Sequence, residues 1–247
     1  MTLHRFYLPP ALWDPDNLCL DEAESRHASE VLRLRPGDLL SVFNGQGQEI
    51  HARLTQQGKR GSLLAAESTH HSPPPPHALL LAPAIPKGKN MDFVLQKATE
   101  LGATAIFPLL TERTVVRLDP SEAADKQDKW QRLVIEACKQ CGQNHLPTVH
   151  LPQSFASFIA SPPPNDWPLI AALAPDALPL HALLPAAPPR RALLLIGPEG
   201  DFTPAELAAA RAAHFRPFSL GPLILRAETA ALAALTLAAY ELNRAAP

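Results

Sequence analysis

The sequence predicts an α/β protein in two parts, a small closed β-barrel followed by a larger unit with a parallel sheet. Three observations lead to this fold class. Short strand-like stretches fill residues 1–72. Four consecutive prolines at 73–76 lock the backbone φ angle and stiffen the chain into a linker. From residue 77 to 247, strand-like and helix-like stretches alternate, which is typical of a parallel sheet with helices on both faces.

The first part carries the pattern of a small barrel. Strands are expected at residues 4–8, 39–43, 49–54 and 62–66, and one short helix at 26–34. The stretch Asn44-Gly45-Gln46-Gly47 between two of these strands is typical of a hairpin turn. Closure into a barrel suits short strands of this kind, because it removes their exposed edges.

The second part carries the alternating pattern. Strands are expected at residues 78–84, 104–110, 169–173, 192–196 and 217–220, and helices at 91–101, 121–143, 203–214 and 228–244. The apolar runs at 169–173 and 192–196 are typical of strands that are buried on both faces. Thr203, Pro204 and Glu206 can supply the N-cap, N1 and N3 positions of a capping box, which marks the start of a helix.

Composition describes an ordinary globular chain. Its 247 residues, 46% of them hydrophobic and 19% charged, can bury a sizeable core. The start of the chain has no apolar signal-peptide core, and no stretch has the length and hydrophobicity of a membrane span. Three cysteines, an odd number, do not suggest a disulfide framework. We therefore expect a cytoplasmic protein. The net charge of −2 argues mildly against a nucleic-acid partner, although a local basic patch can exist on an acidic protein.

Two strand-to-helix loops carry the candidate chemistry. The run that ends in Ile196 enters Gly197-Pro198-Glu199-Gly200, and a second strand enters the loop 220–226. Ligands bind at the carboxyl ends of strands in parallel sheets, and glycine lets them approach the backbone. Neither loop is a dinucleotide fingerprint or a P-loop. From the residues alone, a plain turn for the first loop and a structural Arg226–Glu228 pair for the second stay open.

Cys138 and Cys141, followed by His145 and His150, invite a zinc interpretation. The two cysteines fall on the helix expected at 121–143, where a binding loop is absent. We therefore expect no metal site.

The two loops resemble those of the RsmE-type ribosomal RNA uridine-N3 methyltransferases of the SPOUT superfamily. Further blocks that are similar to this family follow one another in the same order: Arg5-Phe6-Tyr7, 27–38, Lys87-Gly88, 96–102 and 108–113. The likeness spans nearly the whole chain, and the ordered set of blocks is far more specific than any one of them.

The resemblance implies a PUA-like RNA-binding barrel at 1–72 and, at 77–247, a SPOUT methyltransferase domain with a trefoil knot. It implies a homodimer that uses S-adenosyl-L-methionine to methylate N3 of a uridine in 16S ribosomal RNA of the small subunit. Two alternatives stay open. One is a methyltransferase of the same fold that acts on another RNA or base. The other is a non-catalytic RNA-binding protein with a degenerate pocket.

The resemblance also implies site residues. Those for the cofactor are Leu173, Ala174, Ile196, Gly197, Pro198, Glu199, Gly200, Leu220, Gly221, Ile224, Leu225, Arg226 and Thr229. Candidate contacts for the phosphates of a folded RNA are Arg5, Arg26, Arg33, Arg35, Lys87, Lys89 and Arg113, and solvated surface charge stays open as the alternative for each. Glu228 is the expected base for the N3 proton, and Arg226 is expected to stabilise the uracil oxygens. Glu199 could instead serve the turn alone.

Three residues depart from the family pattern. Asp201 stands where a second glycine is usual after the first loop, Leu223 where a basic residue is common, and Gln143 where an arginine is frequent. These departures bear on loop geometry and on individual RNA contacts. Cofactor binding depends largely on backbone groups and is less affected.

Overall fold

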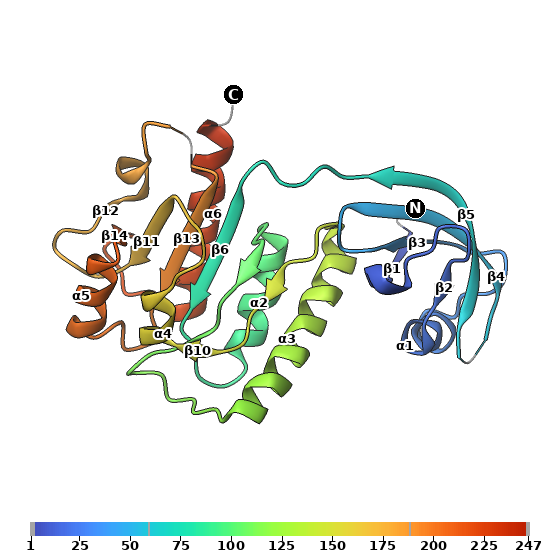
Figure 1. The fold of residues 1–247 in the computed structure, drawn as a ribbon, viewed down its shortest axis with the longest axis horizontal. Coiled ribbons are helices and arrows are strands. Elements are labelled where there is room, and N and C mark those ends of the chain that lie inside the picture. Colours follow the sequence, from blue (N-terminus) through green and yellow to red (C-terminus); the bar gives the residue numbers. More distant parts are fainter. Residues whose placement is uncertain (1–2, 59, 188, 246–247) are drawn as a thin grey trace. The chain divides into compact units, whose positions relative to one another are not determined.

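The computed structural model describes residues 3–58, 60–187 and 189–245 (Figure 1). The outer ends of the two expected domains, residues 1–2 and 246–247, lie outside the described residues. Two compact units are present. The first unit contains the chain up to Pro74 together with Ile135–Leu146, and the second contains Pro75–Val134 together with the chain from Pro147 onward.

The first unit is a curled sheet of five strands in the order β1-β3-β4-β5-β2 (Figure 1). Its strands are β1 (His4–Tyr7), β2 (Cys19–Leu20), β3 (Leu39–Phe43), β4 (Gln48–Gln56) and β5 (Ser62–His71). The predicted hairpin is confirmed, because β3 and β4 pair antiparallel across residues 44–47. Alternate residues of β4, namely Ile50, Ala52 and Leu54, are fully buried, as the two-residue period of a half-buried strand requires.

The helix of the first unit begins earlier than the sequence predicted. α1 (Glu22–Arg26) continues into a π-helical turn, η2 (His27–Val31), so the expected span 26–34 was wrong at both ends. Asp21 starts α1, because its carboxylate accepts the N–H of Glu24 at 2.8 Å. Arg33 ends the helical path by taking a left-handed backbone with φ 57°.

A part-buried polar network joins β1 and β4 to the segment after α3 (Pro120–Cys141) inside the first unit. The Arg5 guanidinium donates to Glu49 at 2.6 Å and to the Asn144 side-chain oxygen at 2.7 Å. Asn144 in turn donates to the second oxygen of Glu49 at 2.8 Å. Ser41 also donates to Glu49. The carboxylate therefore accepts hydrogen bonds from three parts of the chain, namely β1, β3 and the segment after α3.

The second unit contains a seven-stranded sheet in the order β12-β14-β11-β13-β6-β7-β9, and every pairing in it is parallel. Its strands are β6 (Ala78–Pro83), β7 (Ala105–Ile106), β9 (Thr148–Val149), β11 (Trp167–Ala171), β12 (Leu178–Pro179), β13 (Arg191–Ile196) and β14 (Arg216–Ser219). Residues 192–196 of β13 are all buried, which confirms the strand predicted from the apolar run.

The strand predicted at 104–110 is two strands in the structure. β7 belongs to the main sheet, whereas β8 (Leu109–Leu110) pairs with β10 (Gln153–Ser154) in a separate two-stranded sheet. Pro108 lies between them and has no N–H to continue a ladder, which accounts for the break.

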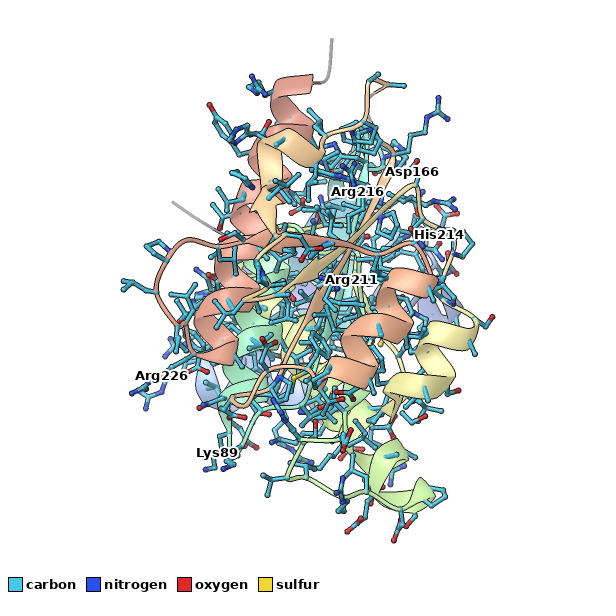
Figure 2. All side chains as sticks on the ribbon, turned by 90° about the vertical axis from the view of Figure 1, so that its left-hand side faces the viewer. Lys89, Asp166, Arg211, His214, Arg216 and Arg226 are labelled. Carbon is cyan, nitrogen blue, oxygen red and sulfur yellow. The ribbon has the colours of Figure 1, made fainter. Side chains whose placement is uncertain are left out.

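Helices cover both faces of the main sheet. They are α2 (Asn90–Glu100), α3, α4 (Phe155–Ala160), α5 (Pro204–Ala212) and α6 (Ala227–Ala245), with short 3₁₀ turns η1 (Pro10–Leu12) in the first unit and η3 (Leu180–Leu183) in the second. Figure 2 shows α6, which begins beside Arg226, and α5, which carries Arg211, on opposite sides of the sheet. The predicted capping box of α5 is present. Among the described residues, none of the helices combines the length and hydrophobicity that a membrane crossing requires.

The order of the strands changes direction around β11. After β11 the chain forms β12 at the edge of the sheet and returns to β13 on the other side of β11. It then crosses by way of α5 to β14, which lies between β11 and β12. In parallel sheets, a reversal of this kind opens a crevice at the carboxyl ends of the strands involved. Those ends are therefore the first place to look for a ligand site.

The network around Glu49 makes a prediction about pH. Burial alone would raise the pKa of Glu49, but hydrogen bonds from Ser41 and Asn144 and the charge of Arg5 outweigh it and hold the pKa below the usual 4.5. A lowered folded-state pKa contributes stability above the unfolded pKa, and that contribution is lost as the pH falls through the folded value. Glu49→Gln should be less stable than the wild type at neutral pH.

The same variant should lose less of its stability than the wild type between about pH 5 and pH 3. Urea unfolding at a series of pH values measures both effects. Glu67→Gln removes an exposed carboxylate that pairs with Arg53 and is the matched control. Equal acid sensitivity of wild type and Glu49→Gln would show that the network contributes nothing to stability.

Candidate functional site

Three neighbouring loops form one pocket at the carboxyl edge of the main sheet. They follow β11, β13 and β14, which lie side by side in the order β14-β11-β13. The pocket is lined by Ala171, Ala172, Leu173, Ile196, Gly197, Pro198, Glu199, Asp201, Leu220, Gly221, Leu223, Ile224, Leu225, Ala227 and Ala230. The two loops singled out in the sequence thus lie beside each other, with the end of β11 between them.

The lining is mostly apolar, with few charged side chains. Glu199 and Asp201 are the only ionisable residues in the lining. Within the described residues, the backbone N–H groups of Gly197 and Leu225 donate no hydrogen bond. Polar backbone groups need a partner, so these two are available to a bound molecule. A pocket of this kind suits a ligand with apolar surface and a few hydrogen-bonding atoms.

The loop 197–200 is held from two other loops of the same unit. Glu199 accepts the backbone N–H of Lys87 at 3.0 Å. The Arg113 guanidinium donates to the carbonyl of Gly200. These bonds hold the loop in place through residues that are far from it in the sequence, so no local motif could have predicted them. They assign Glu199 a structural role in this loop.

Glu206 secures the neighbouring helix start from both sides. One carboxylate oxygen accepts the N–H of Thr203 at 2.9 Å within the capping box, and the other accepts the N–H of Glu112 at 2.9 Å. A single carboxylate thus joins the start of α5 to the loop after β8. Because α5 starts directly after the pocket loop, its position also fixes the pocket.

The structure shows how aspartate fits at position 201, where the family pattern has glycine. Its backbone is left-handed, with φ 61°, which explains why glycine is usual at this position. Aspartate tolerates this region better than most residues, because its short side chain can bond locally. Here the carboxylate accepts the N–H of Phe202 at 2.8 Å. The substitution therefore preserves the loop and adds a carboxylate to the pocket wall.

The loop after β14 is open to solvent. Gly221 has φ 110°, a conformation that favours glycine, and its N–H donates to the Ser219 hydroxyl at 3.1 Å. Leu223 and Ile224 are 72% and 82% exposed. Two large apolar side chains that project from a pocket rim are unusual in the absence of a partner.

The structure brings together most of the expected cofactor residues. Nine of them line the pocket: Leu173, Ile196, Gly197, Pro198, Glu199, Leu220, Gly221, Ile224 and Leu225. Ala174 lines an adjoining hollow with Pro175 and Phe202, and Gly200, Arg226 and Thr229 are outside the lining.

Sequence reasoning missed six lining residues, namely Ala171, Ala172, Asp201, Leu223, Ala227 and Ala230. Ala171 and Ala172 lie at the end of the strand expected at 169–173, and this position at the carboxyl end of a strand could have indicated that they line the pocket. Asp201 and Leu223 had been noted as departures from the family pattern, without a place in the pocket.

Arg226 and Glu228 lie at the rim, at the start of α6. Figure 2 shows Arg226 projecting outward from the unit, on the same side as Lys89. Glu228 is half-buried in the first turn of α6, where a negative charge meets the positive end of the helix dipole. Their positions suit contact with a second substrate that approaches from outside, more than contact with a molecule inside the pocket.

The expected RNA contacts of the first unit divide into two kinds. Arg26, Arg33 and Arg35 are exposed, and Arg26 also pairs with Glu22 at 2.9 Å. Arg5 differs, because its side chain is 11% exposed and bonds to Glu49. That arginine serves the internal network and is not a free cation.

In the second unit, the side chains of Lys87 and Lys89 are exposed just before α2. Arg113 is also exposed, but its guanidinium is bonded to the pocket loop. Its role in this structure is to hold that loop.

The cysteine and histidine residues do not gather into a site. Cys138 is fully buried and burial raises the pKa of its thiol to about 12, whereas Cys141 is exposed. Burial lowers the pKa of His150, whose ring stacks on Phe107 with centroids 4.1 Å apart. In the part of the chain that the structure describes, no three His, Cys, Asp or Glu side chains are grouped to hold a metal ion.

Comparison with known proteins places this geometry in a family. An RNA methyltransferase domain model matches residues 73–239, and an RNA methyltransferase PUA domain model matches residues 20–65. Ribosomal RNA small subunit methyltransferase E of Synechocystis is 35% identical, over 94% of this chain and 76% of the relative.

Two solved structures are similar along almost the whole chain. A methyltransferase from Legionella pneumophila, with SAM bound, is 33% identical with a TM-score of 0.89, over 96% of this chain and 97% of the other. A ribosomal RNA small subunit methyltransferase E from Neisseria gonorrhoeae, bound to S-adenosyl methionine, is 34% identical with a TM-score of 0.85, over 96% of each chain.

Substitutions at Asp201 test the backbone argument. Asp201→Gly and Asp201→Asn should keep the stability of the wild type, because both residues accept a left-handed backbone. Asp201→Val should lose about 1–2 kcal/mol, since a β-branched side chain is strained there. Thermal unfolding measures the loss, and hydrogen exchange at 197–202 locates it. If valine is as stable as glycine at this position, the left-handed conformation does not constrain the loop.

Proposed function

This chain belongs to the RNA methyltransferase family that contains ribosomal RNA small subunit methyltransferase E, and we propose that it methylates N3 of one uridine in 16S ribosomal RNA. It is an S-adenosylmethionine-dependent enzyme with a SPOUT methyltransferase fold and a PUA-like first domain. The observation that carries the proposal is the pocket made by the three adjacent strand ends, with Arg226 and Glu228 at its rim.

The residues present fit the cofactor. Leucine, isoleucine and alanine side chains of the lining offer apolar surface for an adenine ring. The unpaired N–H groups of Gly197 and Leu225 can bind its polar atoms. When bound, S-adenosylmethionine supplies an electrophilic methyl group on a sulfonium. The trefoil knot that we propose for residues 77–247 rests on the family to which the chain belongs.

Arg226 and Glu228 act on the base to be methylated. Attack by N3 requires that its proton leave, and we assign its acceptance to the half-buried Glu228 carboxylate in the first turn of α6. Negative charge then spreads to the uracil oxygens, which the exposed Arg226 guanidinium can stabilise. The pocket walls hold the donor while the rim holds the acceptor, so that the two are positioned together.

The RNA substrate is large and folded, so it must be held and its target base must leave the stack. Exposed cations on both units can bind its phosphates: Arg26, Arg33 and Arg35 in the first, and Lys87 and Lys89 in the second. We propose that the first domain, residues 1–72, serves RNA binding, and that the second carries methyl transfer together with further RNA contacts. Arg5 is not part of this set, because its charge is neutralised inside the first unit.

We further infer a homodimer, active in the cytoplasm where ribosomal subunits are made. Exposed apolar side chains of the second unit need a cover, among them Leu223, Ile224 and Tyr240, and a second copy would supply it. Light scattering checks this inference. A mass of one 26.7 kDa chain would contradict it.

The first test uses small ribosomal subunits that lack the N3-methyluridine mark. Labelled S-adenosylmethionine and the purified protein are added. The RNA is then digested, and mass spectrometry identifies the nucleoside that carries the label and the RNA fragment that contains it. Label in N3-methyluridine at one position is the expected result. Label in another nucleoside or RNA would move the substrate, and no transfer by a folded protein that binds RNA would favour a degenerate pocket.

Substitution of the rim residues gives a sharper prediction. Glu228→Gln should lower kcat by about a hundredfold or more, because it removes the proton acceptor. Its rate should recover partly as pH rises, since hydroxide can then remove the proton. Arg226→Gln should lower kcat by about a hundredfold at every pH. Both should keep the affinity of the wild type for S-adenosylmethionine.

Thr236→Ala is the control for these two variants, since Thr236 lies further along α6 and its hydroxyl bonds only to Leu232. Single-turnover rates and calorimetric titration of the cofactor are the measurements. A Glu228→Gln enzyme with normal turnover would place the base elsewhere.

A further inference from the structure

Basic side chains gather at the amino edge of the main sheet, at the other end of the strands from the pocket. Arg191 is the first residue of β13, and Arg216 is the first residue of β14. These two strands flank β11, and the register places Arg216 level with Leu194, so the two arginines are about 10 Å apart across the sheet and offset by about 10 Å along it. Arg190 precedes Arg191 directly. We call Arg190, Arg191 and Arg216, together with His214, the amino-edge basic surface.

This surface is separate from the site already described. Arg191 is five residue steps along β13 from the pocket residue Ile196, which corresponds to about 17 Å, and Arg216 is four steps from the pocket residue Leu220, or about 13 Å. Figure 2 shows Arg216 and His214 on one side of the unit with Asp166, and Arg226 and Lys89 at the opposite end. A cation at the amino edge therefore cannot touch a base at the pocket rim.

The side chains are held in place on rigid elements. One guanidinium nitrogen of Arg216 donates to the carbonyl of Leu183 at 3.2 Å, and the same carbonyl accepts the buried Trp167 indole at 2.9 Å. His214 has a left-handed backbone with φ 67° and is exposed. Arg216 and His214 line one hollow together with Pro217 and other residues.

Neighbouring acids that the structure describes form no ion pair with the guanidinium groups of Arg190, Arg191 and Arg216. Asp166 lies beside the first two and accepts their backbone N–H groups at 2.9 and 2.8 Å, so its single negative charge offsets only part of the positive charge at this edge. Asp176 pairs with a different arginine, Arg211, at 2.6 Å. Within the described residues, the guanidinium groups of Arg190 and Arg191 form no ion pair and no hydrogen bond. The edge thus keeps positive charge on a chain whose net charge is −2.

We propose that the amino-edge basic surface binds phosphates of the ribosomal RNA at a distance from the nucleotide that is methylated. The proposal rests on the proposed function. Arginine binds phosphate through its planar fork of donors, and such contacts position a substrate without reading its sequence. A surface about 13–17 Å from the pocket can only be reached by a substrate that extends beyond the target nucleotide. It would therefore help the enzyme to hold a ribosomal subunit while adding nothing for a short RNA.

The test compares charge-neutral and charge-keeping variants of the whole protein. Arg190→Gln/Arg191→Gln/Arg216→Gln removes three charges, and the corresponding triple lysine variant keeps them. Lys126→Gln/Lys129→Gln/Arg132→Gln removes three charges from α3 and is the matched control. For each, KM and kcat are measured at several salt concentrations on unmethylated small subunits and on a short RNA that contains only the target loop.

The triple glutamine variant should raise KM for subunits about tenfold, with kcat unchanged. The slope of log(kcat/KM) against log salt should fall by about one for each arginine that contacts a phosphate. Values for the short RNA should match the wild type, the lysine variant should recover most of the affinity, and the α3 control should differ little. Direct binding of subunits gives the same comparison without methyl transfer, so failure of the proposed function is recognised separately.

Three results would overturn the proposal. Wild-type KM and salt slope in the triple glutamine variant would show that the surface does not contact the substrate. An equal loss in the α3 control would show an effect of net charge alone. A loss on intact subunits with an unchanged salt slope on protein-free 16S RNA would assign the surface to a ribosomal protein. If the triple variant unfolds, Arg190→Gln/Arg191→Gln decides, because these guanidinium groups support no other residue.

Discussion

The parallel pairing of β11 with both β13 and β14 is the constraint on which the site depends. Because these strands run in one direction, their carboxyl ends meet at one edge, and the loops that follow must share that edge. The reversal of strand order around β11 separates the loops enough to leave a pocket. Apolar side chains on both faces of β13 are buried, so packing against the layers on either side holds this strand in place.

The pocket loops then take their shape from contacts beyond their own sequence. Glu199 is bonded to Lys87, which follows β6 of the main sheet, and Gly200 is bonded to Arg113, which follows β8 of the two-stranded sheet. Such bonds restrict the loop before any ligand arrives, which lowers the entropic cost of binding. The first unit relies on a comparable device, because Glu49 satisfies donors from distant parts of the chain.

Much of this fold could be predicted from the sequence, because period-two and apolar runs report burial directly. β3, β13 and the capping box of α5 follow from such local signals. The split of the strand at 104–110 was missed, although Pro108 gave a signal for it. The ion pair of Arg5 with Glu49 could not be predicted, since the two residues are far apart in the sequence. The positive φ of Asp201 likewise becomes visible only once the loop is built.

The central claim is that the three loops form the cofactor pocket, and hydrogen exchange with and without S-adenosylmethionine tests it most directly. The account predicts slower exchange at 171–173, 196–201 and 220–230 when the cofactor is added, with no change at 211–216. Binding of the cofactor with unchanged exchange in these three loops, or with protection at another edge of the sheet, would contradict it.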